Sequence, residues 1–260
     1  MGYDTLSNMY DNDDLTVLDT AAELESPLDD LEPIDAASEA EKPDPEEMLV
    51  LLKSPKTPER MLATRAFCEL QDERAIPDLI HLLTDVCPLV RVSAAYALGR
   101  NPSSTAVEPL IDQLNRDWNG YVRKGVVWAL GNSRDRRALP SLIDALKTDI
   151  SAVRLWAASS LAQMAHLEYE DILACIPPLI TALKQDPMAA VRSNCAWSLG
   201  QLCRELPSNA IYACAVDGLI EAFAEDEDMG VQEDAKAALL RVGDPRALQM
   251  IEAIELEGLF

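Results

Sequence analysis

Large aromatic side chains recur at a fixed distance from a repeated Val-Arg pair, and they are the residues of this sequence best suited to bind a partner. The position five residues after each Arg is occupied in turn by Arg65, Tyr96, Trp128, Ser159, Trp197 and Ala237. At about 100° per residue, this position lies almost opposite the apolar positions that must face the core. Because soluble proteins rarely leave large rings in water without use, the pattern predicts a binding surface.

Further side chains join this aromatic column. Trp156 follows its Val-Arg pair by two residues and falls at the edge of the same helix face. Since the second helix of each pair lines the concave side of a helical solenoid, we expect the rings to point into a groove. The predicted partner-binding residues are Tyr96, Lys124, Trp128, Trp156, Ser159, Asn194, Trp197 and Gln201. The alternative is that the rings pack on the first helix or on a long loop.

The Arg of each pair forms a second column, which is either a ladder of anion-binding sites or a structural device. Its members are Arg60, Arg91, Arg123, Arg154 and Arg192, and Gln232 takes their place in the last copy. An Asp precedes most of the pairs by four or five residues. An Arg one turn inside each helix can pair with such carboxylates and connect neighbouring repeats, which favours the structural interpretation. Gln232 agrees with it, because a terminal repeat has no further neighbour.

Cysteine and histidine offer little for a self-contained metal or catalytic site. Cys87 lies in a turn, and Cys195 and Cys203 share one helix near the aromatic column, but no pair has zinc or iron–sulfur spacing. These three thiols are therefore candidates only for a cluster shared with a partner. His81 and His166 are isolated, and the sequence has no Gly-rich phosphate loop or nucleophile elbow, which excludes hydrolytic catalysis.

An internal repeat predicts the elements that carry these residues. Val-Arg pairs or weaker copies of them place their second residue at 60, 91, 123, 154, 192 and 232. Each opens a helix rich in small residues, and a proline-containing helix precedes it. The prolines are expected in the first helical turn, where a missing N–H costs little. One such pair cannot bury its apolar face alone, so neighbouring pairs must stack into an α-solenoid.

The repeats divide the chain into two parts. Residues 44–260 are expected to form an all-α solenoid of about six helix pairs, with a last helix near 245–257 and longer loops near 165–172 and 204–210. Residues 1–43 are predicted to be a disordered tail, because they are dense in Asp and Glu and lack a helical period. This acidic tail is either solubilising or, given its recurring apolar residues, a docking segment or a lid for the protein's own groove.

Charge and composition exclude several classes of partner. The chain has 45 acidic and 22 basic side chains, a formal charge of −23, and residues 1–47 hold 16 of the acids with one base. Nonspecific binding to nucleic acid or to anionic membranes needs clustered cations, so neither is expected as a partner. No signal peptide or membrane-spanning stretch is evident, and six Cys without C-x-x-C spacing favour a cytoplasmic protein.

The repeats resemble the HEAT-like repeats of the phycobilisome-lyase type over residues 44–260. Residues 117–131 and 155–158 are also similar to cyanobacterial HEAT-repeat proteins that partner the A-type iron–sulfur carrier. This resemblance implies a noncatalytic scaffold in cluster assembly or iron sensing. It also implies that the chain has no intrinsic cofactor and that a [2Fe–2S] cluster belongs chiefly to the complex.

The same family includes phycobilin lyases, so the alternative is a lyase subunit or a bilin chaperone for phycobiliproteins. This is the one enzymatic activity that the resemblance implies, and a second lyase subunit would then be a partner. An aromatic groove suits stacking on an open-chain tetrapyrrole. Against it, the predicted groove supplies only one cation, Lys124, for the two propionates of a bilin. The sequence therefore favours a protein-binding scaffold.

Overall fold

Residues 43–256 are described in a computed structural model of the chain. The tail predicted for residues 1–43 lies, except for residue 43, outside this range. The described residues form helices joined by short turns, with no strand among them. None of these helices combines the length and the apolar character that a membrane span requires. The predicted all-α architecture is confirmed.

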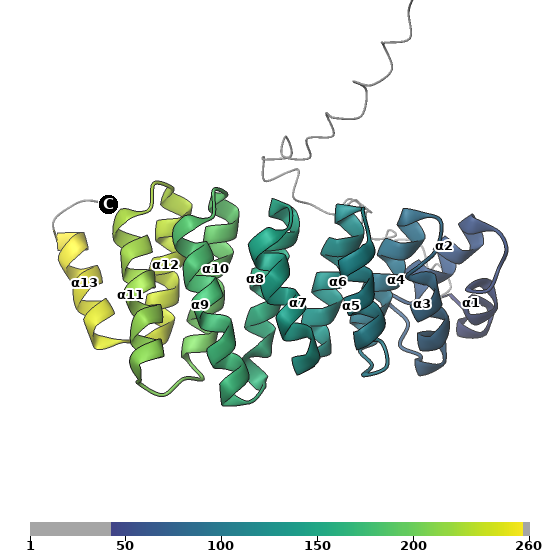
Figure 1. The fold of residues 1–260 in the computed structure, drawn as a ribbon, viewed down its shortest axis with the longest axis horizontal. Coiled ribbons are helices and arrows are strands. Elements are labelled where there is room, and N and C mark those ends of the chain that lie inside the picture. The colour runs from purple at the N-terminus through teal and green to yellow at the C-terminus, as the bar shows by residue number, and fades with distance from the viewer. Residues whose placement is uncertain (1–42, 257–260) are drawn as a thin grey trace, which may run out of the picture. The chain divides into compact units, whose positions relative to one another are not determined.

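The helices alternate between two rows (Figure 1). The first helices of the pairs are α1 (Pro45–Leu51), α3 (Ile76–Leu82), α5 (Val107–Arg116), α7 (Leu139–Thr148), α9 (Tyr169–Gln185) and α11 (Ala210–Glu225). The second helices are α2 (Thr57–Ala66), α4 (Pro88–Arg100), α6 (Gly120–Ser133), α8 (Ser151–Ala162), α10 (Ala189–Cys203) and α12 (Met229–Val242). A last helix, α13 (Pro245–Leu256), packs against α11 and α12. Six helix pairs and a closing helix are the arrangement that the repeat predicts.

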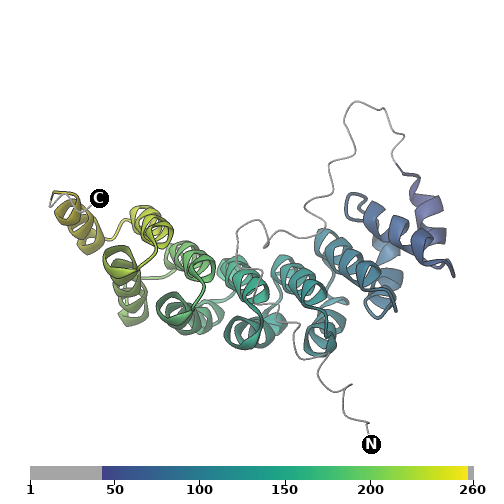
Figure 2. The same ribbon diagram turned by 90° about the horizontal axis from the view of Figure 1, so that it is seen from above.

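The second helices form the inner row of a curved solenoid, as Figure 2 shows in a view along the helices. Each inner helix packs on the inner helix of the next pair, from α2 through α4, α6, α8 and α10 to α12. Side chains on the exposed side of these helices therefore share one concave face. The predicted concave position of the second helices is confirmed for the described residues.

Glycines let the inner helices approach one another closely. A Cβ atom on Gly99 would lie 2.3 Å from Cζ3 of Trp128, and one on Gly200 would lie 2.8 Å from Cβ of Ala238. Gly131 is blocked in the same way by Ser160 of α8, the next inner helix. All three glycines lie eight residues after the repeated Arg, so one repeat position provides the close contact between inner helices.

Two prolines depart from the prediction that they occupy the first helical turn. Pro77 and Pro140 do lie there, but Pro177 and Pro178 lie inside α9, which begins at Tyr169. The reason is that the longer repeat spacing extends the first helix at its start, in addition to the loop before it. α9 has 17 residues and α11 has 16, whereas α7 has 10.

Candidate functional site

The repeated arginines form a ladder of ion pairs from each repeat to the next. Arg91 donates from Nε to Asp117 Oδ2 at 2.7 Å and from Nη2 to Oδ1 at 2.9 Å, which makes a bidentate pair. The same fork joins Arg60 to Asp85, Arg123 to Asp149, Arg154 to Asp186, and Arg192 to Asp226. Each of these Asp residues precedes the next repeated pair, so the predicted connection between neighbouring repeats is confirmed.

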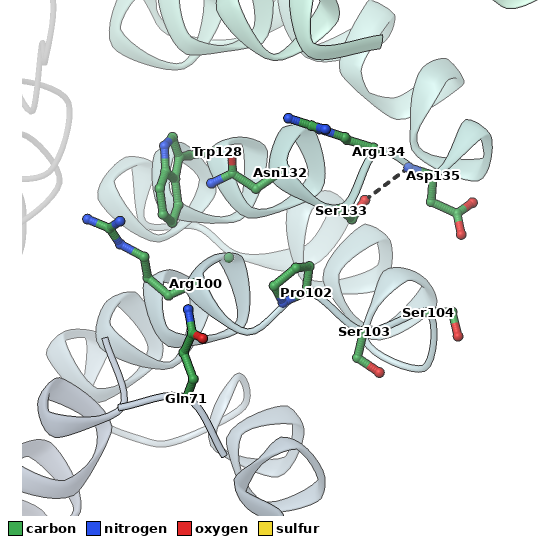
Figure 3. Close-up of a pocket in the computed structure, with 11 residues that line it drawn as sticks. Gln71, Arg100, Pro102, Ser103, Ser104, Trp128, Asn132, Ser133, Arg134 and Asp135 are labelled. Atoms are coloured by element: carbon green, nitrogen blue, oxygen red, sulfur yellow. Dashed lines mark hydrogen bonds between the residues drawn. The ribbon is translucent and has the colours of Figure 1, made fainter. Parts of the chain in front are cut away.

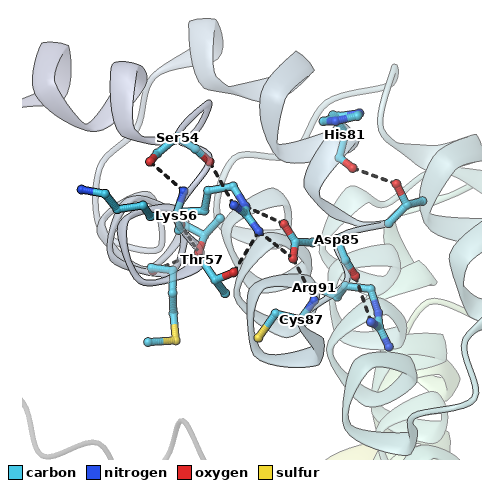
Figure 4. A network of polar contacts seen from close by, with 11 residues as sticks. Ser54, Lys56, Thr57, His81, Asp85, Cys87 and Arg91 are labelled. Carbon is cyan, nitrogen blue, oxygen red and sulfur yellow. Dashed lines mark hydrogen bonds and ion pairs between the residues drawn. The ribbon is translucent and has the colours of Figure 1, made fainter.

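Each ladder arginine also holds its own repeat. Its Nη1 donates to a backbone carbonyl five or six residues earlier, as that of Arg91 does to Asp85 at 3.0 Å (Figure 4). The Asp85 carboxylate in turn accepts a 2.8 Å hydrogen bond from the N–H of Cys87, which orders the turn between the helices. Gln232 keeps the carbonyl contact, donating to Asp226 at 2.6 Å. The last copy thus keeps the hydrogen bond within its own repeat but has no arginine to form the ion pair.

Three of the ladder carboxylates, Asp85, Asp117 and Asp226, have lowered pKa values within this network. Burial opposes the charge of Asp117, but hydrogen bonds from Arg91 and from the Asn119 N–H outweigh it, so the pKa of Asp117 lies below its ordinary value. The pKa values of Asp85 and Asp226 are lowered by the same balance. Because the Arg and the Asp of each ion pair bind one another, the ladder has a structural role and leaves no cation for an anionic ligand.

The aromatic column lies on the inner helices, and its rings are partly buried against their neighbours. Tyr96 of α4 and Trp128 of α6 have ring centroids 5.2 Å apart, with planes inclined at 41°. The Trp128 ring also lies against Gly99, and the Arg100 guanidinium is 5.8 Å from its centroid. These contacts join adjacent inner helices and hold the rings in place, while part of each ring stays exposed.

Lys124 contradicts the prediction that it is a groove cation beside the aromatic column. Its side chain is buried, with 2% of the residue exposed, and its ammonium lies 5.2 Å from the centroid of the Trp156 ring. The physical reason is its helix position, one residue after the repeated Arg, which faces α8. The neighbouring ring covers the lysine and makes it part of the packing between two inner helices.

The remaining predicted residues extend this surface to α8 and α10. The Ser159 hydroxyl donates to Asn194 Oδ1 at 2.8 Å and links the two helices. Trp197 and Gln201 follow on α10 and are partly exposed. Of the eight predicted residues only Lys124 is buried, and the other seven are partly exposed on the inner helices α4, α6, α8 and α10. We call these seven residues the inner aromatic face.

A cleft of about 730 Å³ adjoins this face at the ends of α4 and α6 (Figure 3). Trp128 lines it together with Arg100, Asn132 and Arg134, three residues that were not predicted from the sequence. A signal for two of them was present. Arg100 and Asn132 lie nine residues after the repeated Arg, one helical turn beyond the aromatic position and on the same face.

Arg134 has an unusual backbone conformation. Its φ of 51° and ψ of 35° fall in the left-handed region, and it is the one non-glycine residue with positive φ in the described part of the chain. It ends α6 eleven residues after Arg123. Gly243, with a φ of 71°, occupies the same repeat position at the end of α12. A residue other than glycine in the left-handed region destabilises the fold by roughly 1 kcal/mol relative to glycine.

The thiols considered for a shared cluster do not form an accessible group. Cys195 is 0% exposed and Cys203 is also buried, because both face the core and not the inner aromatic face. Burial raises the pKa of the Cys203 thiol to about 12 and also raises the pKa of Cys195. Cys87 is partly exposed in its turn. Among residues 43–256, no three His, Cys, Asp or Glu side chains are grouped to hold a metal ion.

A second exposed row, which the repeat pattern did not predict, lies at the turns between paired helices. Val86 is 87% exposed and Trp118 is 77% exposed, and each directly follows a ladder Asp. Leu89 and Tyr121, two residues before a ladder Arg, are exposed as well. The sequence did contain a signal for this row, because apolar residues occur at turn positions where the fold does not require them. We call these four residues the turn row.

The repeats match a family model. Residues 45–126, 107–175 and 176–255 match the model for HEAT repeats, which together covers most of the chain. The chain therefore belongs to the HEAT-repeat family. No curated protein sequence matches it.

Solved structures share the fold at low sequence identity. One is a designed armadillo repeat protein in complex with the peptide (KR)4, with 21% identity over 76% of this chain and 98% of that chain and a TM-score of 0.59. Another is yeast importin-beta (Kap95p), with 20% identity over 80% of this chain and 32% of that chain and a TM-score of 0.55. These likenesses support the HEAT and armadillo type of solenoid.

Proposed function

We propose that this chain is a noncatalytic scaffold whose inner aromatic face binds a protein partner. The observation that carries the proposal is the partial exposure of aromatic and polar side chains on four successive inner helices, α4, α6, α8 and α10. Rings held by their neighbours, as Trp128 is by Tyr96 and Gly99, lose little conformational entropy when a partner covers them. The peptide complex of the designed armadillo repeat protein supports binding by this type of fold.

The first partner to test is the A-type iron–sulfur carrier, which the sequence resemblance implies. In this form of the proposal the scaffold positions the carrier in cluster assembly or iron sensing. A [2Fe–2S] cluster would be ligated chiefly by the partner, because Cys195 and Cys203 are buried and protonated at neutral pH. Cys87, in the turn before α4, is the one of the three candidate thiols that has solvent access.

A second candidate is a phycobilin lyase subunit or a bilin chaperone, and one observation favours it. Arg100 and Arg134 line the cleft beside Trp128, so a ring for stacking and two cations for propionates occur together. The test is to mix the protein with a bilin and record its absorption spectrum. A red-shifted, sharpened band is expected for this function, and an unchanged spectrum at micromolar protein would contradict it.

The scaffold proposal is tested by replacing Trp197 with alanine in the full chain. Partners are captured from the cells that make the protein, and purified A-type carrier is titrated by calorimetry. We expect Trp197→Ala to weaken the affinity at least about tenfold, because aromatic anchors typically contribute 2 kcal/mol or more to binding. Trp118→Ala is the matched control, since it removes the same side chain from the turn row and is expected to keep the wild-type affinity.

Thermal melting separates lost binding from lost folding. Trp197 is partly buried, so its removal is expected to lower the Tm by a few degrees while the helical circular dichroism persists. Gln201→Glu is a second variant, because it adds a charge to the same face without truncating a ring. Wild-type affinity in both inner-face variants, or an equal loss in Trp118→Ala, would contradict the proposal.

A further inference from the structure

The cleft beside Trp128 contains two arginines with no acidic partner among the described residues. The Arg100 guanidinium lies over the Trp128 ring, and Figure 3 draws the Arg134 side chain away from Arg100, beyond Asn132. The lining includes one carboxylate, Asp135, and Arg137 already pairs with it at 2.7 Å. The cleft therefore presents an uncompensated positive charge.

The backbone at Arg134 has a conformation that glycine would adopt at lower cost. At the same repeat position the end of α12 has Gly243, which adopts positive φ without strain. Arg134 adopts positive φ with a full side chain and is exposed. Strain of this kind persists most often at functional sites, where a side chain serves binding at the expense of the fold.

The composition of the chain makes this local charge selective. With 45 acidic and 22 basic side chains, the net charge of the chain repels an acidic segment, and the two arginines provide a local exception. Guanidinium groups bind carboxylates through forked hydrogen bonds. Ser103 and Asn132, which also line the cleft, add polar groups for a peptide backbone, and Trp128 provides a surface for aliphatic carbons.

We propose that the cleft formed by Arg100, Trp128 and Arg134 binds a carboxylate-rich, extended segment of the protein partner. This inference rests on the proposed function and names the chemistry of its ligand, because the cleft adjoins the inner aromatic face through Trp128. One carboxylate of the segment pairs with Arg100 and another with Arg134, while the segment contacts the Trp128 ring. The cleft thereby selects acidic segments from among those that the inner face contacts.

The test uses the full chain and two labelled peptides of equal length, (GluAla)4 and (GlnAla)4, in fluorescence anisotropy titrations. (GluAla)4 is expected to bind more tightly, and its affinity is expected to fall as salt screens the charges. Arg134→Gly is expected to weaken binding of (GluAla)4 about three- to fivefold while raising the Tm by about 2–4 °C, because it relieves the backbone. Arg100→Gln combined with Arg134→Gly is expected to weaken it about tenfold.

Arg204→Gln is the matched control, since it removes one exposed cation at the end of α10, outside the cleft lining. Its affinity for (GluAla)4 is expected to remain at the wild-type value. Equal binding of the two peptides, or an unchanged affinity in the double variant, would overturn the inference. If the partner is still captured through Trp197 in that case, the scaffold proposal stands and only the acidic nature of the bound segment is rejected.

Discussion

The Arg–Asp ladder and the inner aromatic face both occur once per repeat, but they differ in sequence, burial and charge. The ladder has Arg in five successive copies, each joined to an Asp of the next repeat and largely buried. The aromatic position changes from Arg65 to Tyr96, Trp128, Ser159 and Trp197, and these side chains keep part of their surface in water. The comparison indicates that a repeat position with one residue type holds neighbouring repeats together, whereas a varied, exposed position is free to serve binding.

The glycine position supports this distinction. Gly99, Gly131 and Gly200 recur at one place in the repeat, where a Cβ atom would meet the next inner helix. Like the ladder, this position is uniform because it is constrained by a neighbouring repeat. The inner aromatic face and the cleft have no such uniformity, which is expected if an external ligand sets their requirements.

Breaking one Arg–Asp ion pair of the ladder is expected to have the largest effect on stability. Arg91→Ala leaves the Asp117 carboxylate buried without its guanidinium, and losing one partner of a buried ion pair typically costs about 3–5 kcal/mol. Urea unfolding followed by circular dichroism measures this loss. Arg74→Ala is the matched control, because its ion pairs lie at the surface and its removal is expected to leave the Tm nearly unchanged. A loss of unfolding free energy no greater than that of the control would contradict a structural role for the ladder.

Acid is expected to weaken the ladder through its carboxylates. The pKa values of Asp85, Asp117 and Asp226 are lowered in the folded chain, so their stabilisation is complete above the ordinary Asp pKa of about 3.9 and is lost as the pH falls below it. Melting curves between pH 7 and pH 2 measure this dependence. In Arg91→Ala, protonation of Asp117 removes a buried charge, so the gap in Tm to wild type is expected to narrow in acid. A constant gap would contradict this account.

Placing an arginine at the last position of the ladder is expected to have the smallest effect on stability. Gln232→Arg can keep the contact to the Asp226 carbonyl, but the chain has no Asp after Asp244 to accept the forked hydrogen bonds. Its free energy of unfolding should therefore differ from wild type by less than about 0.5 kcal/mol. Urea titration under the conditions used for Arg91→Ala provides the comparison. A gain of more than about 1 kcal/mol would show that the ladder needs no partner from a following repeat.

The repeat pattern was sufficient to predict the fold and the ladder, because both depend on relations that recur along the chain. Spacing predicted the helix pairs and the Arg–Asp connection, and the general architecture of helical solenoids predicted the inner row. The lengthening of α9 around Pro177 and Pro178 was not predicted, since extra residues between repeats can extend either a loop or a helix.

The sequence by itself predicted seven residues that are partly exposed on the inner helices, because helical periodicity assigns every position to a side of its helix. Only the tertiary structure decided which of the eight predicted residues remain exposed. Lys124 is covered by the Trp156 ring of the next repeat, while Arg100 and Arg134 are brought to one cleft from different helices. Periodicity describes one helix at a time, whereas burial and charge pairing depend on the neighbour that packs against it.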